Sequence, residues 1–231
     1  MVNGVLSEIK IGASLNHPKI NRIYGVAIDS EMTLLVVQEL AKNSLADLLK
    51  ENLTLKRKNI ISLEIAEILY TLKTLKIIHR DLKPQNFLVN FNDSLQVCDF
   101  GSQVSENFCF TLHFAPPEII LEEQDGKGKV GYYSDIWSFG CILHRIYYGK
   151  DVWNGYTEAK MMKSLWEKKL PKVEKEDDVP VKISEIINKC LVFDENKRMT
   201  IEEILEEMKG IGKNGEEKIG VDNKEIAEEE T

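Results

Sequence analysis

Two short polar stretches constrain this chain of 231 residues more than any other part of it. The first is Ile77–Asn86, which reads I-I-H-R-D-L-K-P-Q-N, and the second is Val97–Gly101, which reads V-C-D-F-G. Each stretch places an aspartate, Asp81 or Asp99, just after a short apolar run, where the end of a strand can present a side chain. We therefore interpret both stretches as parts of a functional site rather than as ordinary turns between strands.

Both stretches resemble motifs of one family, the eukaryotic protein kinases. The first matches the kinase catalytic loop and the second matches the kinase magnesium-binding motif. The matching residues are His79, Arg80, Asp81, Lys83 and Asn86 in the first stretch, and Asp99, Phe100 and Gly101 in the second. The sequence Lys-Pro-Gln-Asn after Asp81 is similar to serine/threonine kinases and differs from the tyrosine kinases.

The resemblance implies a chemistry that these residue types can perform. Phosphoryl transfer depends on positioning the reactants and on neutralising negative charge near the transferred group. Asp81 is expected to accept the proton of a substrate hydroxyl, and Lys83 to reach the transferred phosphate. Asn86 and Asp99 offer the oxygen ligands that Mg²⁺ prefers. ATP and Mg²⁺ are thus the implied cofactors, and a protein hydroxyl is the implied substrate.

Further matches follow along the chain. Thr111–Glu118 resembles the end of a kinase activation segment, although Phe114 and Pro116 differ from the family pattern. Ser134–Leu143 resembles the αF helix, in which Asp135 is expected to be buried and to hold the catalytic-loop backbone. The resemblance also implies that Arg198 pairs with Glu118.

The nucleotide-binding residues are expected near the start of the chain and on one later strand. Leu6–Leu15 resembles the αC helix, which makes Glu8 the glutamate that pairs with a lysine in the family. The expected hinge is Glu39-Leu40-Ala41, whose backbone binds adenine in kinases. The gatekeeper is Val37 or Gln38. Leu88 is expected to lie under the adenine ring.

Hydrophobic periodicity and capping patterns predict the remaining elements. Trp166 is expected to pack on the helical lobe. The predicted strands are Ile23–Ala27, Thr33–Gln38, Phe87–Val89 and Leu95–Cys98. The predicted helices are a short one from Ser44 to about Glu51, then Asn59–Leu75, Asp135–Tyr148, Thr157–Lys168, Val181–Val192 and Thr200–Met208, with capping boxes at Ser44-x-x-Asp47 and Thr200-x-x-Glu203. Ile119–Tyr133, which contains three glycines, is expected to be one mobile loop.

Composition excludes several classes of protein. The net charge of −8 argues against binding to nucleic acids or to anionic membranes. No apolar run approaches the roughly 18 residues that a membrane helix needs, and the first residues do not form a secretory signal. The four cysteines are scattered without a C-x-x-C pair, which favours a reducing, cytoplasmic location.

Part of the kinase pattern has no counterpart in this sequence. The glycine-rich loop and the partner lysine precede αC in the family, but only seven residues precede Glu8 and none is lysine. The expected fold is therefore α+β and kinase-like, with a mainly helical C-lobe and an incomplete N-lobe that exposes apolar surface. We expect this domain over residues 1–209, followed by a disordered acidic tail over residues 210–231.

Two functional interpretations remain open at this point. The first is a serine/threonine protein kinase whose activity in residues 1–231 alone is weak. The second is a catalytically silent, kinase-derived module that binds a regulatory protein partner. A phosphate on Ser102 or Ser105 that pairs with Arg80 is a further hypothesis for the activation segment, and Thr111 is expected to be structural.

Overall fold

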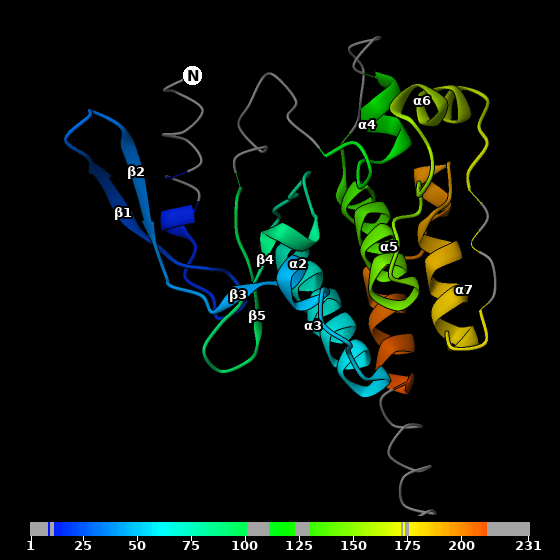
Figure 1. Ribbon diagram of the computed structural model, residues 1–231, viewed down its shortest axis with the longest axis horizontal. Helices are drawn as coiled ribbons and strands as arrows, with labels where there is room; N and C mark the ends of the chain where they lie inside the picture. The colour runs from blue at the N-terminus through cyan, green and yellow to red at the C-terminus, as the bar shows by residue number, and fades with distance from the viewer. Residues whose placement is uncertain are drawn as a thin grey trace, which may run out of the picture.

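One central helix organises the molecule in the computed structural model (Figure 1). This helix, α5 (Tyr132–Tyr148), buries thirteen of its seventeen residues. Such a helix must be apolar nearly all round, as its sequence is. Helices α3 (Leu55–Thr74) and α7 (Val181–Cys190) pack against it. Gly149 ends α5 in the left-handed conformation, with φ of 68°, which glycine adopts without strain.

The structure describes residues 9, 12–100, 111–122, 130–171, 173 and 176–211. The predicted positions Glu8, Gly101, Ser102 and Ser105 lie outside these residues, as does the tail after residue 211. Residues 9 and 12–14 are helical, in agreement with the helix expected over 6–15, although residue 15 is no longer helical.

Local capping explains where several helices begin. The Thr54 hydroxyl accepts a hydrogen bond from the Arg57 amide, so α3 begins at Leu55, earlier than the predicted Asn59. Both predicted capping boxes form, at Ser44 and at Thr200. The other helices are α2 (Leu45–Leu48), α4 (Pro117–Glu122), α6 (Glu158–Trp166) and residues 201–211, with short 3-10 turns η1 (Pro84–Asn86) and η3 (Glu195–Lys197).

The described strands form two small antiparallel sheets. One is a hairpin of β1 (Ile23–Ile28) and β2 (Leu34–Gln38), which projects from the helical body at the left of Figure 1. The other contains β3 (Asn43–Ser44), β4 (Phe87–Val89) and β5 (Leu95–Val97) in that order. The three-stranded sheet lies against α3; β4 directly follows the first polar stretch, and β5 leads into the second.

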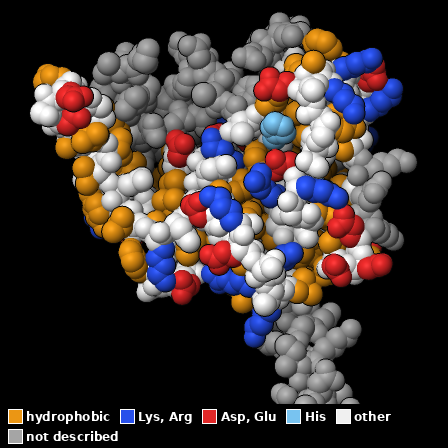
Figure 2. All heavy atoms as spheres, in the orientation of Figure 1, with side chains coloured by type: hydrophobic (Ala, Val, Ile, Leu, Met, Phe, Trp, Pro, Cys, Tyr) orange, Lys and Arg blue, Asp and Glu red, His pale blue; other side chains and the backbone are white. Residues whose placement is uncertain are grey.

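The β1–β2 hairpin exposes apolar side chains on both of its faces. Val26 pairs with Val36, and the next pair along the hairpin is Ala27 with Leu35. The first pair points to one face and the second pair to the other, because side chains alternate along a strand. The exposed apolar residues of the two strands are Tyr24, Val26, Ile28, Leu34, Leu35, Val36 and Val37. Figure 2 shows this hydrophobic surface along the hairpin. The predicted exposure of apolar surface in the N-lobe is therefore confirmed.

Two predictions about the helical part are wrong. Trp166 does not pack on the lobe, since 59% of it is exposed, and Met161 and Leu165 are the residues of α6 that point inward. The region 119–133 is also not one loop. Ile119 and Ile120 are buried in α4, where burial of their apolar side chains outweighs the loop tendency of the glycines that follow.

Candidate active site

The Asp81 carboxylate meets Lys83, which lies two residues further along the chain, and Thr111, which lies thirty residues away. The Lys83 ammonium donates to Asp81 Oδ2 at 2.6 Å and to Thr111 Oγ1 at 3.0 Å. The Thr111 amide donates to Asp81 Oδ1 at 3.0 Å, so both carboxylate oxygens are engaged. The Asp81 side chain is only 11% exposed and that of Lys83 is 22% exposed. This arrangement holds an oriented carboxylate next to a cation at the edge of the helical body.

Asp135 on α5 holds the backbone of the catalytic loop. Its carboxylate accepts hydrogen bonds from the His79 amide at 2.8 Å and from the Arg80 amide at 2.9 Å, as the sequence predicted. The backbone of Arg80 has a φ of 73°, a conformation that residues other than glycine rarely adopt. The two hydrogen bonds to Asp135 help to hold the loop in this strained conformation. Burial raises the pKa of the Asp135 carboxyl, and His79 and the two amides oppose that shift.

His79 connects the catalytic loop to the second polar stretch. Its Nε2 lies 2.9 Å from the Cys98 carbonyl oxygen, which can only accept, so Nε2 carries the proton. The His79 ring also lies 5.2 Å from the buried ring of Phe100. These two contacts flank Asp99 on both sides and fix its position relative to Asp81.

Asn86 and Asp99 are suited to hold a magnesium ion. The Asn86 amide nitrogen donates to the Asp81 carbonyl at 2.8 Å, which assigns the side-chain oxygen to the other side. The Cys98 amide donates to the Asn86 carbonyl at 3.0 Å, which brings Asp99 beside Asn86. Asp99 is exposed. The described residues contain no cluster of three or more His, Cys, Asp or Glu. Two oxygen ligands suffice where waters and phosphates complete the shell of Mg²⁺.

In the expected hinge, the backbone of Glu39 is hydrogen-bonded within the protein, whereas the backbone of Ala41 is not bonded to any described residue. Glu39 donates its amide to the Arg22 carbonyl at 2.8 Å, and its carbonyl accepts from the Asn21 side chain at 3.1 Å. Among the described residues none hydrogen-bonds the backbone of Ala41. Leu88 is partly exposed, while its neighbours in β4 are buried. Ala41 and Leu88 thus present the polar and apolar groups that a nucleotide base needs.

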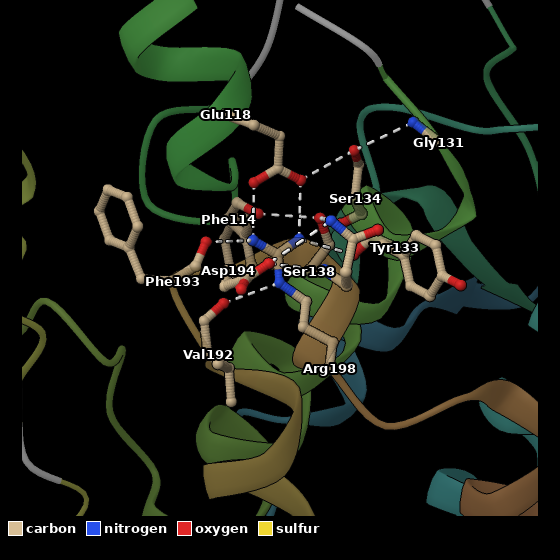
Figure 3. A network of polar contacts seen from close by, with 11 residues as sticks. Phe114, Glu118, Gly131, Tyr133, Ser134, Ser138, Val192, Phe193, Asp194 and Arg198 are labelled. Atoms are coloured by element: carbon tan, nitrogen blue, oxygen red, sulfur yellow. Dashed lines mark hydrogen bonds and ion pairs between the residues drawn. The ribbon is translucent and has the colours of Figure 1, made fainter.

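A buried ion pair supports the site from the side of α4 (Figure 3). Arg198 donates to Glu118 through two nitrogens, at 2.7 and 2.6 Å, which is the predicted pair. Its guanidinium lies over the ring of Trp137 at 5.1 Å. Ser134 donates to Glu118 at 3.0 Å, and Ser138 donates to the Phe114 carbonyl at 2.8 Å. These contacts fix α4 and the segment that carries Thr111 onto α5.

Comparison with known proteins agrees with this geometry. The family model of the protein kinase domain matches residues 2–208. The chain belongs to the protein kinase family. Its relatives include an Aurora kinase of Dictyostelium discoideum, 27% identical over 209 residues, and the probable serine/threonine-protein kinase CCRP1 of Zea mays, 30% identical over 221 residues. A third relative is the serine/threonine-protein kinase PLK4 of Nematostella vectensis, 30% identical over 218 residues.

The matches cover most of this kinase chain but less of its relatives. They include 86%, 87% and 89% of the chain, and 52%, 33% and 21% of the three relatives in the same order. The kinase chain therefore spans about half or less of these proteins. No helix among the described residues is both long enough and apolar enough to cross a membrane.

Sequence reasoning missed several polar residues that support the kinase site. It assigned no role to Ser134 or Ser138, although both lie in the αF-like stretch and both bond the activation segment. It also passed over Asn21 and Gln96, which are buried next to the hinge. A polar residue within an apolar run was the only available signal at Gln96, and it does not say which segment the side chain meets.

Proposed function

We propose that this domain transfers the γ-phosphoryl group of ATP to a serine or threonine hydroxyl of a protein substrate. The contact between Asp81, Lys83 and Thr111 is the observation that carries the proposal. It places one proton acceptor and one cation together, with a hydroxyl side chain at the edge of the activation segment.

The proposed roles follow from the positions of these groups. Asp81 accepts the proton of the substrate hydroxyl, whose oxygen forms a bond to the γ-phosphorus while the bond from phosphorus to the ADP oxygen breaks. The Lys83 ammonium turns from Asp81 toward the transferred phosphoryl group and neutralises negative charge there. Asn86 and Asp99 would hold Mg²⁺, which supplies positive charge against the phosphates when it is bound.

The base of ATP would bind between Ala41 and Leu88. The Ala41 backbone would make the polar contacts to adenine, and the partly exposed Leu88 would pack on one face of the ring. Glu39, whose backbone is engaged within the protein, would position the hinge and would retain one carbonyl lone pair for the base.

Residues 1–231 alone should transfer phosphate slowly. This polypeptide contains no glycine-rich loop and no lysine ahead of Glu8, so water reaches the phosphates and weakens electrostatic contacts there. Each missing contact should cost about 2–4 kcal/mol in the transition state. Two such losses slow transfer roughly 10³-fold or more.

The test measures radiolabelled phosphate transfer to a generic basic protein, together with binding of a fluorescent ATP analogue. Asp81→Asn should abolish the remaining transfer while leaving nucleotide binding intact, and Asp99→Asn should abolish the magnesium dependence of binding. Asp93→Asn is the matched control, since Asp93 is exposed and pairs only with Lys42 among the described residues. Robust transfer by the short chain would contradict the slow rate proposed here.

A second candidate function is a binding module that performs no chemistry. The exposed apolar β1–β2 hairpin favours this alternative, because large exposed apolar patches commonly mark interaction sites for protein partners. Failure of magnesium-dependent nucleotide binding, in a chain that still folds, would favour the module over the kinase.

A further inference from the structure

Two buried amide side chains connect the hinge to the strand that precedes Asp99. Asn21 lies just before β1 and is 2% exposed, whereas Gln96 lies in the middle of β5 and is 5% exposed. The Asn21 amide nitrogen lies 3.1 Å from the Glu39 carbonyl oxygen and 3.5 Å from Gln96 Oε1. The Gln96 amide nitrogen lies 3.3 Å from a carboxylate oxygen of Glu39. Both amides therefore converge on the first hinge residue.

Backbone hydrogen bonds hold the same three segments together. The Asn21 amide donates to the Val97 carbonyl, and the Val97 amide donates to the Lys19 carbonyl, each at 2.9 Å. The Glu39 amide donates to the Arg22 carbonyl at 2.8 Å. Residues 19–22 consequently lie between β5 and the end of β2, and the two side-chain amides complete the connection.

Packing alone does not explain an asparagine at position 21. Its side-chain oxygen is buried and has no hydrogen-bond partner among the described residues. An unpaired buried acceptor costs free energy, so filling space is not by itself a reason for an amide at this position. The donor half of the amide, which bonds Glu39 and approaches Gln96, is the half that has a use.

The position of this connection gives that use. β2 leads directly into Glu39 and Ala41, while β5 leads through Cys98 into Asp99. A nucleotide whose base binds the hinge and whose phosphates meet Asp99 requires these two segments at a fixed separation. We propose that Asn21 and Gln96 are positioning residues, which lock the hinge to β5 and so set the separation between the base-binding backbone and Asp99. The nucleotide part of this inference rests on the proposed function.

The test combines hydrogen exchange with nucleotide binding on the whole chain. Asn21→Ala and Gln96→Leu should each speed amide exchange in residues 34–40 without changing exchange in α5. Each should also raise the Kd of a fluorescent ATP analogue with Mg²⁺ about three- to tenfold, the effect of losing one net hydrogen bond. Because the two amides act together, the double variant should raise the Kd by less than the product of the single effects.

Asn188→Ala is the matched control. Asn188 also donates through its side-chain amide, to the Ser184 carbonyl at 2.8 Å, but it lies on α7 away from the hinge. It should leave the Kd unchanged. If Asn21→Ala does not fold, Asn21→Leu keeps a branched side chain of similar size and removes the donor without adding a charge.

Three outcomes would overturn the inference in distinct ways. Unchanged exchange in residues 34–40 in both variants would show that the amides do not hold the hinge. Faster exchange with a Kd equal to that of Asn188→Ala would remove their role in positioning the nucleotide. If the unaltered chain binds no magnesium nucleotide, the proposed function and the nucleotide role both fail, while hydrogen exchange still decides whether the amides hold the hinge.

Discussion

Replacing Glu118 by glutamine should destabilise the kinase domain more than a single neutral substitution at its surface. All five N–H donors of Arg198 have an acceptor. Two of them bond Glu118, and the others bond the carbonyls of Tyr133, Val192 and Phe193. The Arg198 side chain is 0% exposed and that of Glu118 is 8% exposed. Glu118→Gln keeps the shape but turns an NH₂ group toward a guanidinium nitrogen, and it leaves a buried cation without its anion.

The expected loss follows from this burial. Removing one partner of a buried ion pair costs about 3–5 kcal/mol, because the remaining charge is uncompensated. Three carbonyl oxygens continue to accept from Arg198, so the lower figure of about 3 kcal/mol applies. That is a large share of the roughly 5–15 kcal/mol that stabilises a domain. It corresponds to a fall in Tm of about 6–12 °C for a chain of this length.

The assay is reversible urea unfolding followed by tryptophan fluorescence, since Trp137 lies directly under Arg198. Glu202→Gln is the control. It removes the carboxylate of a surface pair with Lys73, in which Glu202 is 51% exposed, and it should cost less than about 1 kcal/mol. The double variant Glu118→Gln with Arg198→Met should be more stable than Glu118→Gln alone. Equal losses for Glu118→Gln and Glu202→Gln would refute the reasoning.

Three further predictions concern packing, pH and solubility. Gly140→Ala should lower the free energy of unfolding by about 1–3 kcal/mol, because a Cβ there would lie 2.8 Å from that of Cys190. Gly210→Ala, which meets no atom within 4 Å in a helical segment, should instead raise it by about 0.5–1 kcal/mol. Burial lowers the pKa of His144 below the usual histidine value of about 6.5. Near that pH this side chain therefore binds a proton more readily in the unfolded chain than in the folded one. Stability should then fall as pH drops from 7 toward the folded pKa, and His144→Gln should flatten that slope. Val36→Lys in the exposed hairpin should reduce light scattering on concentration, since a charged edge opposes strand pairing.

Each of these predictions has a contradicting result. A Gly140→Ala protein as stable as Gly210→Ala would mean that α5 and α7 separate easily to admit a methyl group. An unchanged pH slope in His144→Gln would assign the acid sensitivity to other groups. Equal scattering by Val36→Lys and the unaltered chain would show that the hairpin does not drive association.

Local patterns were enough to locate most elements and several site contacts. The capping boxes at Ser44 and Thr200 form because cap and amide lie within one turn. The run that became α5 is apolar nearly all round, a pattern that predicts a buried helix. The kinase motifs also predicted that Asp135 would hold the catalytic loop, because the loop backbone requires an acceptor there.

The tertiary structure alone decided which faces meet. The sequence identified Thr111 but not its direct bonds to Asp81 and Lys83, which depend on how α4 docks on α5. It could not tell that Trp166 points outward, since helical spacing does not say which side of a short helix meets the core. It gave no sign that Asn21 and Gln96 meet at Glu39. Caps and periodicity reflect energies within a few residues, whereas burial and long-range hydrogen bonds depend on segments that folding alone brings together.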